Sequence, residues 1–464
     1  MSPPKKRRPA APVPVHGEPV QGEPEPVALL VAGGTVLTLD AADTIVPDGA
    51  IAIRKEKIIA VGPRRELERR YRARRRLEAR DRLILPGLVN AHTHAAMTLF
   101  RGVSDDQELL TWLEKYMFPL EARFVSPDFV RWGTRLACWE MIASGTTTFA
   151  DGYFFTAEVA RVADEAGLRA VPGQGVFDVP TPDAKDSAAG LKRCEALLRE
   201  WQGHPRITPA LCPHSCYTVA PETFPRIQAL AARYHARVMI HAAESQGEMK
   251  MMRERYGTTP VRHLARLGAL GPNLTAAHCV WVDDEEIRLL AEHGVGVAHC
   301  AESNMKLGSG AAPLAKMLAA GVAVGLGTDG PASNNDLDMF GEMATVAKLH
   351  KVASLDPTRA PAAEVLRLAT RGAAAALHLE KEIGSLEPGK RADLIVVETS
   401  SPNALPLYHP YSYLVYSARA DAVETVVVDG KVLMERRRML TLDTEAIRRH
   451  AERYRKKIAA AFPN

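Results

Sequence analysis

Long apolar stretches are missing from this chain of 464 residues. No uninterrupted run approaches the roughly 20 apolar residues that a helix needs to cross a bilayer, so no transmembrane segment is predicted. The basic cluster Lys5-Lys6-Arg7-Arg8 is not followed by the apolar region of a secretory signal. With 46% hydrophobic and 25% charged residues, the composition is that of a globular protein, for which we expect a cytoplasmic location.

Paired cysteine motifs are also missing. The chain has six cysteines, and none of them shows the C-x-x-C spacing of a zinc or redox motif. In a cytoplasmic protein we expect such thiols to be reduced. The H-x-E and P-C-x-x-C signature is not present either, which excludes the zinc fold that carries it.

A strong excess of one charge is not found, because the formal net charge is only +4. Basic residues gather in two places. The first is a Pro- and Gly-rich tail, for which we expect disorder over residues 1–27. The second is the stretch 64–82, where arginines alternate with glutamates, as is typical of a solvated helix or arm. Neither run predicts binding to nucleic acid or to membranes.

Both ends of the chain after the tail carry short β patterns. These apolar runs, separated by turn residues, are 29–39, 49–53, 58–62, 392–397 and 426–433. We therefore predict a small β-sandwich domain made from residues 28–85 and 385–440. A C-terminal helix is expected over residues 441–464.

Between these ends, residues 86–384 alternate between apolar strands, polar loops and helical stretches. The strand candidates are 87–89, 146–149, 169–171, 207–211, 238–240, 274–277, 295–298 and 322–326. The helical candidates include 128–143, 158–166, 221–235 and 283–292. This alternation predicts an α/β fold, a TIM-type (β/α)8 barrel. An open doubly wound sheet is the alternative, but the glycine-rich phosphate turn that it needs is missing.

Polar residues at the ends of the predicted strands can hold a metal ion. His92 and His94 are two residues apart, so both side chains of an extended strand point the same way. His241 adds a third imidazole and Asp329 a carboxylate. This set suits one divalent ion, Zn²⁺ in the first place and Fe²⁺ as the alternative, and leaves room for a water. Catalytic groups of a TIM-type barrel lie at the carboxyl ends of its strands, where these residues fall.

Further residues at strand ends can handle protons. Glu244 follows His241 by three residues, so it can face a substrate and act as a general acid or base. His278 can hydrogen-bond a developing oxyanion or the hydroxide, and Asp329 can accept the proton of the attacking water. His214 stands where related two-metal barrels would carry a bridging lysine, which favours a single ion.

The segments that carry these residues resemble the amidohydrolase superfamily, and within it the branch of 5'-methylthioadenosine/S-adenosylhomocysteine deaminases and chlorotriazine hydrolases. The resemblance extends from about residue 29 to residue 440. The matching segments are 89–94 (VNAHTH), 213–215 (PHS), 241–244 (HAAE), 277–279 (AHC), 303–310 (SNMKLGSG) and 327–335 (GTDGPASNN). The resemblance implies metal ligation by His92, His94, His241 and Asp329, and catalysis by Glu244, His278 and Asp329.

The resemblance also implies substrate contacts. Trp112 matches an aromatic residue that packs on the substrate in similar enzymes, with an ordinary core residue as the other interpretation. His214 matches a residue near the ribose, and Asn334 and Glu244 complete the expected contacts. At the end of strand three, Gln174 stands where we expect an arginine that contacts the amino-acid tail or ribose. Because glutamine cannot form a charged pair with a carboxylate, S-adenosylhomocysteine is disfavoured as the main substrate.

These residues predict a metal-dependent deaminase that releases ammonia from an adenosine-type nucleoside by means of metal-activated hydroxide. The candidate nucleosides are 5'-methylthioadenosine, adenosine and S-adenosylhomocysteine. The alternatives on the same scaffold are hydrolysis of a chlorotriazine or another aminoheterocycle, and deamination of aminodeoxyfutalosine. A non-catalytic barrel would have lost ligands, whereas all of them are present here. We expect a small molecule as the partner; the choice between monomer and homo-oligomer stays open.

Overall fold

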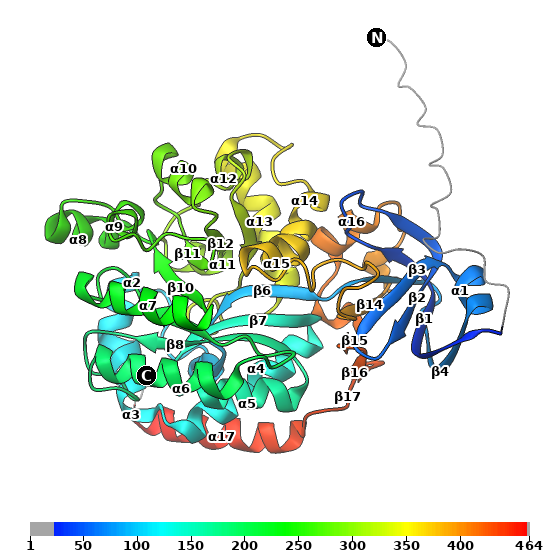
Figure 1. Ribbon diagram of the computed structural model, residues 1–464, viewed down its shortest axis with the longest axis horizontal. Coiled ribbons are helices and arrows are strands. Elements are labelled where there is room, and N and C mark those ends of the chain that lie inside the picture. The colour runs from blue at the N-terminus through cyan, green and yellow to red at the C-terminus, as the bar shows by residue number, and fades with distance from the viewer. Residues whose placement is uncertain (1–22, 462–464) are drawn as a thin grey trace, which may run out of the picture.

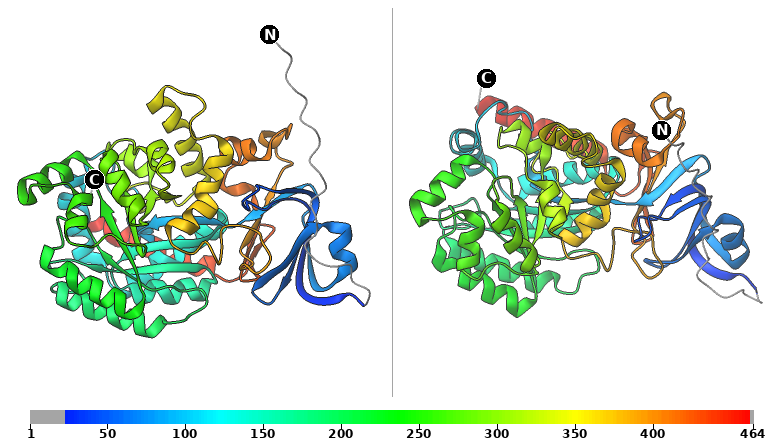
Figure 2. Two further views of the ribbon diagram at one scale, coloured as in Figure 1. Left: turned by 45° about the horizontal axis from the view of Figure 1, so that its top comes forward. Right: turned by 90° about the horizontal axis from the view of Figure 1, so that it is seen from above.

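Two sheets organise the computed structural model, which describes residues 23–461 (Figure 1). Residues 1–22, which contain most of the predicted tail, lie outside the described residues, as do residues 462–464. One sheet curls into a barrel, and the other forms a smaller domain beside it. Figure 2 shows this smaller domain at one end of the molecule, where blue strands from the start of the chain meet orange segments from its end.

The larger sheet consists, in the described part of the chain, of eight parallel strands in sequence order. They are β6 (Leu88–Thr93), β7 (Thr146–Tyr153), β8 (Arg169–Val176), β9 (Ala210–Pro213), β10 (Arg237–Ala242), β11 (Leu274–His278), β12 (Gly296–His299) and β13 (Ala323–Leu326). Each of them overlaps or adjoins one of the predicted strands. The predicted (β/α)8 class is therefore confirmed.

The first and last strands of the barrel are joined by a buried side chain. Asn90 on β6 donates from Nδ2 to Thr328 Oγ1 over 2.7 Å, and its Oδ1 accepts from the backbone N of Thr328 over 3.1 Å. At the next residue of the chain, the backbone N of Asp329 donates to the carbonyl of His92 over 2.9 Å. These bonds close the ring of strands at the place where two predicted metal ligands lie.

Helices cover the outside of the barrel, as the strand and helix alternation predicts (Figure 1). Between β6 and β11 they are η1 (Ala95–Phe100), α2 (Leu109–Trp112), η2 (Leu113–Met117), α3 (Phe118–Phe124), α4 (Pro127–Ala143), α5 (Thr156–Ala166), α6 (Ser187–Trp201), η3 (Pro221–Thr223), α7 (Phe224–Tyr234), α8 (Gln246–Tyr256) and α9 (Pro260–Arg266). After β11 they are α10 (Asp284–Glu292), α11 (Ala301–Lys306), α12 (Leu314–Ala319), α13 (Met339–Ser354), α14 (Ala362–Arg367), η4 (Leu368–Gly372) and α15 (Ala373–Ala376). Local sequence explains their ends: α10, for example, begins with a capping box between Asp283 and Glu286.

The smaller sheet has nine strands within residues 23–461. They are β1 (Glu25–Leu37), β2 (Ile45–Arg54), β3 (Lys57–Pro63), β4 (Tyr71–Glu78), β5 (Arg82–Pro86), β14 (Leu394–Glu398), β15 (Val423–Val428), β16 (Lys431–Glu435) and β17 (Arg438–Met439). Their order is β17-β16-β15-β14-β5-β1-β2-β3, with β4 beside β1. The antiparallel pairing of β5 with β14 joins the two ends of the chain, which confirms that they form one small β domain.

Three local expectations differ from the structure. Strand β1 begins at Glu25, inside the predicted tail of residues 1–27. Residues 71–78, in the arginine-rich stretch, form strand β4 because their backbone pairs in parallel with β1 while most of their charged side chains remain exposed; only α1 (Arg64–Arg70) is helical there. The predicted run 426–433 is two strands, because the chain turns between them at residues 429–430, where φ is positive.

The C-terminal helix α17 (Thr444–Ala461) returns to the barrel and packs against α4 and η1 (Figure 1). The ring of His450 stacks on Trp132 at a centroid distance of 3.5 Å, and Tyr454 donates a hydrogen bond to Asp128 over 2.8 Å. Before it come the short helices η5 (Pro402–Ala404), α16 (Pro410–Ser412), η6 (Tyr413–Ser417) and η7 (Ala420–Ala422). Among the described residues, none of the helices is long and apolar enough to cross a membrane.

Candidate active site

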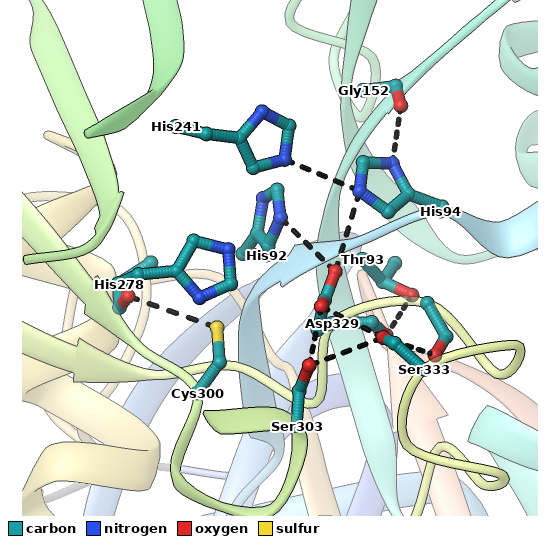
Figure 3. A network of polar contacts seen from close by, with 12 residues as sticks. His92, Thr93, His94, Gly152, His241, His278, Cys300, Ser303, Asp329 and Ser333 are labelled. Carbon is teal, nitrogen blue, oxygen red and sulfur yellow. Dashed lines mark hydrogen bonds and ion pairs between the residues drawn. The ribbon is translucent and has the colours of Figure 1, made fainter. Parts of the chain in front are cut away.

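The carboxyl ends of the barrel strands bring the predicted metal ligands together (Figure 3). β6 carries His92, His94 directly follows β6, β10 carries His241, and Asp329 follows β13. The ligand atoms of His92, His94 and His241 lie within 4.8 Å of one another, and the same holds for His92, His278 and Asp329. Residues that are up to 237 positions apart in the sequence thus form one buried cluster, which we call the histidine cluster.

Two of these histidines already use one ring nitrogen. His94 Nδ1 lies 2.5 Å from the carbonyl oxygen of Gly152, and His241 Nδ1 lies 2.7 Å from that of His214. A carbonyl oxygen only accepts, so each Nδ1 carries a proton, and each Nε2 has a free lone pair when its ring is neutral. The two Nε2 atoms face each other over 3.3 Å. Two lone pairs at this distance repel unless a proton or a metal ion lies between them.

His92 and Asp329 complete the cluster. His92 Nε2 lies 3.3 Å from Asp329 Oδ1, but among the described residues it has no partner in hydrogen-bonding geometry. His94 Nε2 lies at the same distance of 3.3 Å from Asp329 Oδ1. A buried nitrogen without a partner is costly, which suggests that a further group belongs at this place. Three imidazole nitrogens and one carboxylate oxygen fit a divalent transition-metal ion.

The cluster also stabilises positive charge. Burial lowers the pKa of His92 to about 4. Burial acts in the same direction on His94, but the hydrogen bond and the charge of Asp329 outweigh it and raise the pKa of His94 to about 9. Burial would raise the pKa of Asp329, yet the neighbouring imidazoles hold it well below its usual range. An ionised carboxylate in such a buried place favours a bound cation.

Two serines orient Asp329. Its Oδ2 accepts from Ser303 Oγ over 2.7 Å and from Ser333 Oγ over 2.8 Å, which leaves Oδ1 to face the histidines (Figure 3). The backbone of Asp329 is left-handed, with φ at 61°, and that of His278 has φ at 72°. Non-glycine residues in this region cost about 1–3 kcal/mol each, and such strain gathers at functional sites.

Helix α11 carries two of the supporting side chains. Ser303 bonds to Asp329, and Asn304 Oδ1 lies 2.9 Å from His278 Nδ1. The first turn of α11 is held in turn by Glu342, a fully buried residue of α13. The carboxylate of Glu342 accepts from the backbone N of Ala301 over 2.6 Å and from the N of the next residue over 3.3 Å. Contacts therefore run from α13 through α11 to the histidine cluster.

Glu244 lies next to the histidine cluster. Its Oε2 lies 3.8 Å from His278 Nε2, and its backbone N donates to Glu248 Oε2 over 2.7 Å. Burial raises the pKa of the Glu244 carboxyl. A carboxyl with a raised pKa can give and take a proton near neutral pH, as a general acid or base must.

A cavity opens in front of the cluster. His94, His241, Glu244, His278 and Asp329 contribute to its lining. The wall opposite is mostly apolar and is made largely by α2, η2 and the start of α3, with Leu109, Trp112, Leu113, Met117 and Phe118. An apolar cavity with a few convergent polar groups is typical of a small-molecule site.

A model of the amidohydrolase family matches residues 83–433, which include both sides of this cavity. The chain belongs to the amidohydrolase family. It is 49% identical over 419 residues to the 5-methylthioadenosine/S-adenosylhomocysteine deaminase of Syntrophobacter fumaroxidans, across 90% of this chain and 95% of that protein. It is 46% identical over 438 residues to 5-methylthioadenosine/S-adenosylhomocysteine deaminase 1 of Syntrophus aciditrophicus, across 94% and 99%.

Solved structures show the same likeness. An adenosine deaminase from Xanthomonas campestris with bound zinc matches this amidohydrolase with a TM-score of 0.93 at 40% identity, over 94% of this chain and 100% of that one. The atrazine chlorohydrolase of Arthrobacter aurescens, complexed with zinc, matches with a TM-score of 0.85 at 27% identity, over 92% and 99%. Both comparisons cover the barrel and the small domain.

Three of the five residues expected to contact substrate, Glu244 among them, line the cavity of this amidohydrolase, and two do not. Trp112 and His214 lie in the lining, where Phe177 stacks on His214 at a centroid distance of 4.6 Å. Gln174 points away, because the residues of β8 alternate between the two faces; its Nε2 donates to Asp183 over 2.9 Å. Asn334 donates to the carbonyl of residue 328 over 2.9 Å and supports the loop instead. The described structure therefore places neither Gln174 nor Asn334 in the cavity lining.

Sequence reasoning missed Glu121 as a cavity residue. It follows Phe118 and Leu120 on α3, is only 7% exposed, and lines the cavity. Burial raises the pKa of Glu121 to about 7. A glutamate on the buried face of an otherwise apolar helix was the available signal, because such a residue remains inside only with a function or a partner.

Proposed function

We propose that this amidohydrolase removes the exocyclic amine of an adenosine-type nucleoside by hydrolysis and releases ammonia. The observation that carries the proposal is the histidine cluster, with Glu244 beside it, at the end of a largely apolar cavity. The relatives at 41–49% identity that are named as deaminases of 5-methylthioadenosine and S-adenosylhomocysteine support the same chemistry. The adenosine deaminase of Xanthomonas campestris supports it independently.

We infer that His92, His94, His241 and Asp329 hold one divalent ion. Their lone pairs converge, and two of the rings are oriented by carbonyl oxygens. Zn²⁺ is preferred over Fe²⁺, because two of the matching structures contain zinc. When bound, such an ion lowers the pKa of a coordinated water to about 7 and so supplies the nucleophile at neutral pH.

The remaining residues position the water and move its protons. Asn304 Oδ1 accepts from Nδ1 of His278, which leaves Nε2 of this ring to face the attacking water. Asp329 accepts the proton of that water, and Glu244 protonates the ring nitrogen next to the carbon under attack. The amine then takes up the proton that Asp329 received and leaves as ammonia, while Glu244 recovers a proton from the new hydroxyl group, so that a carbon–oxygen double bond replaces the carbon–nitrogen bond.

The cavity wall is suited to a flat ring that carries a sugar. Trp112, Phe177 and His214 offer aromatic surfaces, and burial lowers the pKa of His214 to about 3, so its ring stays neutral. The carboxyl group of Glu121 can accept hydrogen bonds from sugar hydroxyls. These contacts orient the nucleoside so that its amine faces Glu244.

Ammonia release by the metal-loaded protein tests this proposal. We expect turnover of 5'-methylthioadenosine or adenosine, with the change in ultraviolet absorbance that accompanies conversion of the amine to an oxo group. Atrazine and aminodeoxyfutalosine belong in the same panel, since the likeness to atrazine chlorohydrolase makes the triazine reaction the second candidate. Chloride release from the triazine without turnover of any adenosine-type nucleoside would contradict the proposal.

The cytoplasmic location of the protein stays a prediction. All six cysteines are free and buried in the described structure, which suits a reducing cytoplasm. A small molecule is the partner that the cavity supports, whereas the choice between monomer and homo-oligomer remains open to measurement.

A further inference from the structure

The cavity has no permanent positive charge on its wall. Within residues 23–461, neither lysine nor arginine contributes to its lining. The ring of His214, which also lines the cavity, stacks on Phe177 at a centroid distance of 4.6 Å. Away from the histidine cluster and Glu244, the acidic groups in the lining are the carboxyl group of Glu121, two phenols and one thiol.

Lys115 on η2 is exposed, and two other basic residues near the cavity are bound elsewhere. Lys306 precedes Leu307, which lines the cavity, but its ammonium group is held by Asp105 and by Asn335 Oδ1. Arg193 lies over the ring of Phe155, 5.4 Å from its centroid, and donates to the carbonyl of Asp183. Neither of these cations is free to meet an anionic ligand.

The wall of the cavity that is formed by α2, η2 and the start of α3 is apolar and reaches solvent. Leu109, Leu113 and Met117 belong to one continuous segment of α2 and η2, and Phe118 follows them. The side chain of Phe118 is 39% exposed, which places it at the edge of the cavity. A substrate group that extends from the sugar toward solvent meets this apolar edge.

We propose that this cavity selects nucleosides with an uncharged 5' substituent over nucleosides with an amino-acid tail. The inference rests on the proposed deaminase function. The relatives are named for two nucleosides that differ at this position, since one ends in a methylthio group and the other carries a carboxylate and an ammonium group. A carboxylate among apolar side chains and other carboxyl groups loses its hydration without gaining a cation, whereas a methylthio group gains apolar contacts.

The direct test is the ratio of kcat/KM for the metal-loaded full chain with 5'-methylthioadenosine and with S-adenosylhomocysteine. We expect the first to exceed the second by about tenfold or more, the effect of one unpaired charge. Equal values, or a preference for S-adenosylhomocysteine, would overturn the inference. If neither nucleoside nor adenosine releases ammonia, the proposed function fails instead, and the two failures are distinguishable.

Phe118→Arg tests the electrostatic cause. This variant adds a cation at the edge of the cavity and should narrow the ratio severalfold, with a smaller effect at high salt. Val352→Arg is the matched control, because Val352 on α13 is 71% exposed and does not line the cavity; it should leave the ratio unchanged. Phe118→Leu controls for the lost aromatic ring. If Phe118→Arg leaves the wild-type ratio unaltered, the charge of the tail does not govern selection, and the inference is wrong.

Discussion

Two buried polar clusters lie at opposite ends of the barrel, and they differ in how many of their polar atoms have hydrogen-bond partners. At the amino end of β8, Arg169 donates to Asp393 over 2.9 Å, to Asp429 over 2.6 Å and to the carbonyl of Pro205 over 2.8 Å. Asp393 also accepts from the backbone N of Asp429 over 2.8 Å. This arginine cluster fastens the barrel to the small sheet, since the aspartates flank β14 and β15.

In the histidine cluster at the carboxyl end, bonding is incomplete. His92 Nε2 has no hydrogen-bond partner in the described residues, and the Nε2 atoms of His94 and His241 face each other. Complete pairing identifies a joint between two parts of the fold, because nothing is left to bind. Incomplete hydrogen bonding in a buried place identifies a site that can bind a further group.

The largest effect is expected from His241→Ala, which removes a ligand from the incomplete cluster. The variant should lose stoichiometric metal, and kcat/KM should fall by at least about 10³-fold, because the ion and the activated water are lost together. Metal analysis measures the metal content, and ammonia release measures kcat/KM. Removal of the metal from the wild type with a chelator should reproduce the loss of activity. Added Zn²⁺ should restore activity to the chelated wild type but not to the variant. Full metal content with near-normal turnover would remove His241 from the site.

Glu244→Gln separates proton transfer from metal binding in the same cluster. The amide keeps the size of the side chain but cannot shuttle a proton, so the rate should fall by about 10²–10⁴-fold while the metal remains. Steady-state kinetics and metal content of the same preparation give the answer. Loss of the metal would show that Glu244 is a ligand rather than a proton carrier.

Arg169→Ala tests the complete cluster. It removes the guanidinium group that the buried carboxylates of Asp393 and Asp429 share, and should destabilise the fold by about 3–5 kcal/mol. Urea unfolding measures the loss, and kcat/KM of the folded variant should stay unchanged. The matched control is Arg135→Ala, because the partly exposed pair of Arg135 with Glu165 contributes at most about 1 kcal/mol. Equal destabilisation by both variants would contradict the special role of the arginine cluster.

Glu342→Gln should act on the histidine cluster from a distance. The amide presents a donor where the carboxylate accepts from the first turn of α11, so Ser303 and Asn304 should lose their positions. We expect kcat/KM to fall by about 10–100-fold, as for other groups that orient ligands. Asn304→Ala should have a similar effect, and the double variant should be less impaired than the sum of the two. Strict additivity would argue against a common route through α11.

The smallest effect is expected from deletion of residues 1–22. The sequence predicts a polar, Pro-rich tail here, and such a tail is not expected to contribute to either cluster. Both the thermal midpoint and the turnover should match those of the full chain. A clear drop in either would show that the tail contacts the rest of the protein.

Regular features of this fold could be predicted because they depend on nearby residues. Strand β6 and its ligands are an example, since alternation within the strand places His92 and His94 on one side. Hydrophobic runs of strand length between helical stretches located the barrel strands for the same reason.

Features that depend on distant contacts could not be predicted. The arginine-rich stretch becomes strand β4 only because β1 offers its edge. Gln174 turns to Asp183, and Glu342 reaches the first turn of α11 across 41 positions of sequence. Neither contact leaves a local pattern, because the partners meet only after the barrel has closed.

The pairing of β5 with β14 has a consequence for synthesis. β5 leaves the ribosome before the barrel begins, whereas β14 is made only after the barrel is complete. Until then the edge of β5 carries unpaired backbone groups beside apolar Leu83 and Leu85, which is the kind of edge that recruits strands from other chains. A message cut short after the barrel would therefore yield a polypeptide with a permanent aggregation site, which only the last segment of the full-length product can cover.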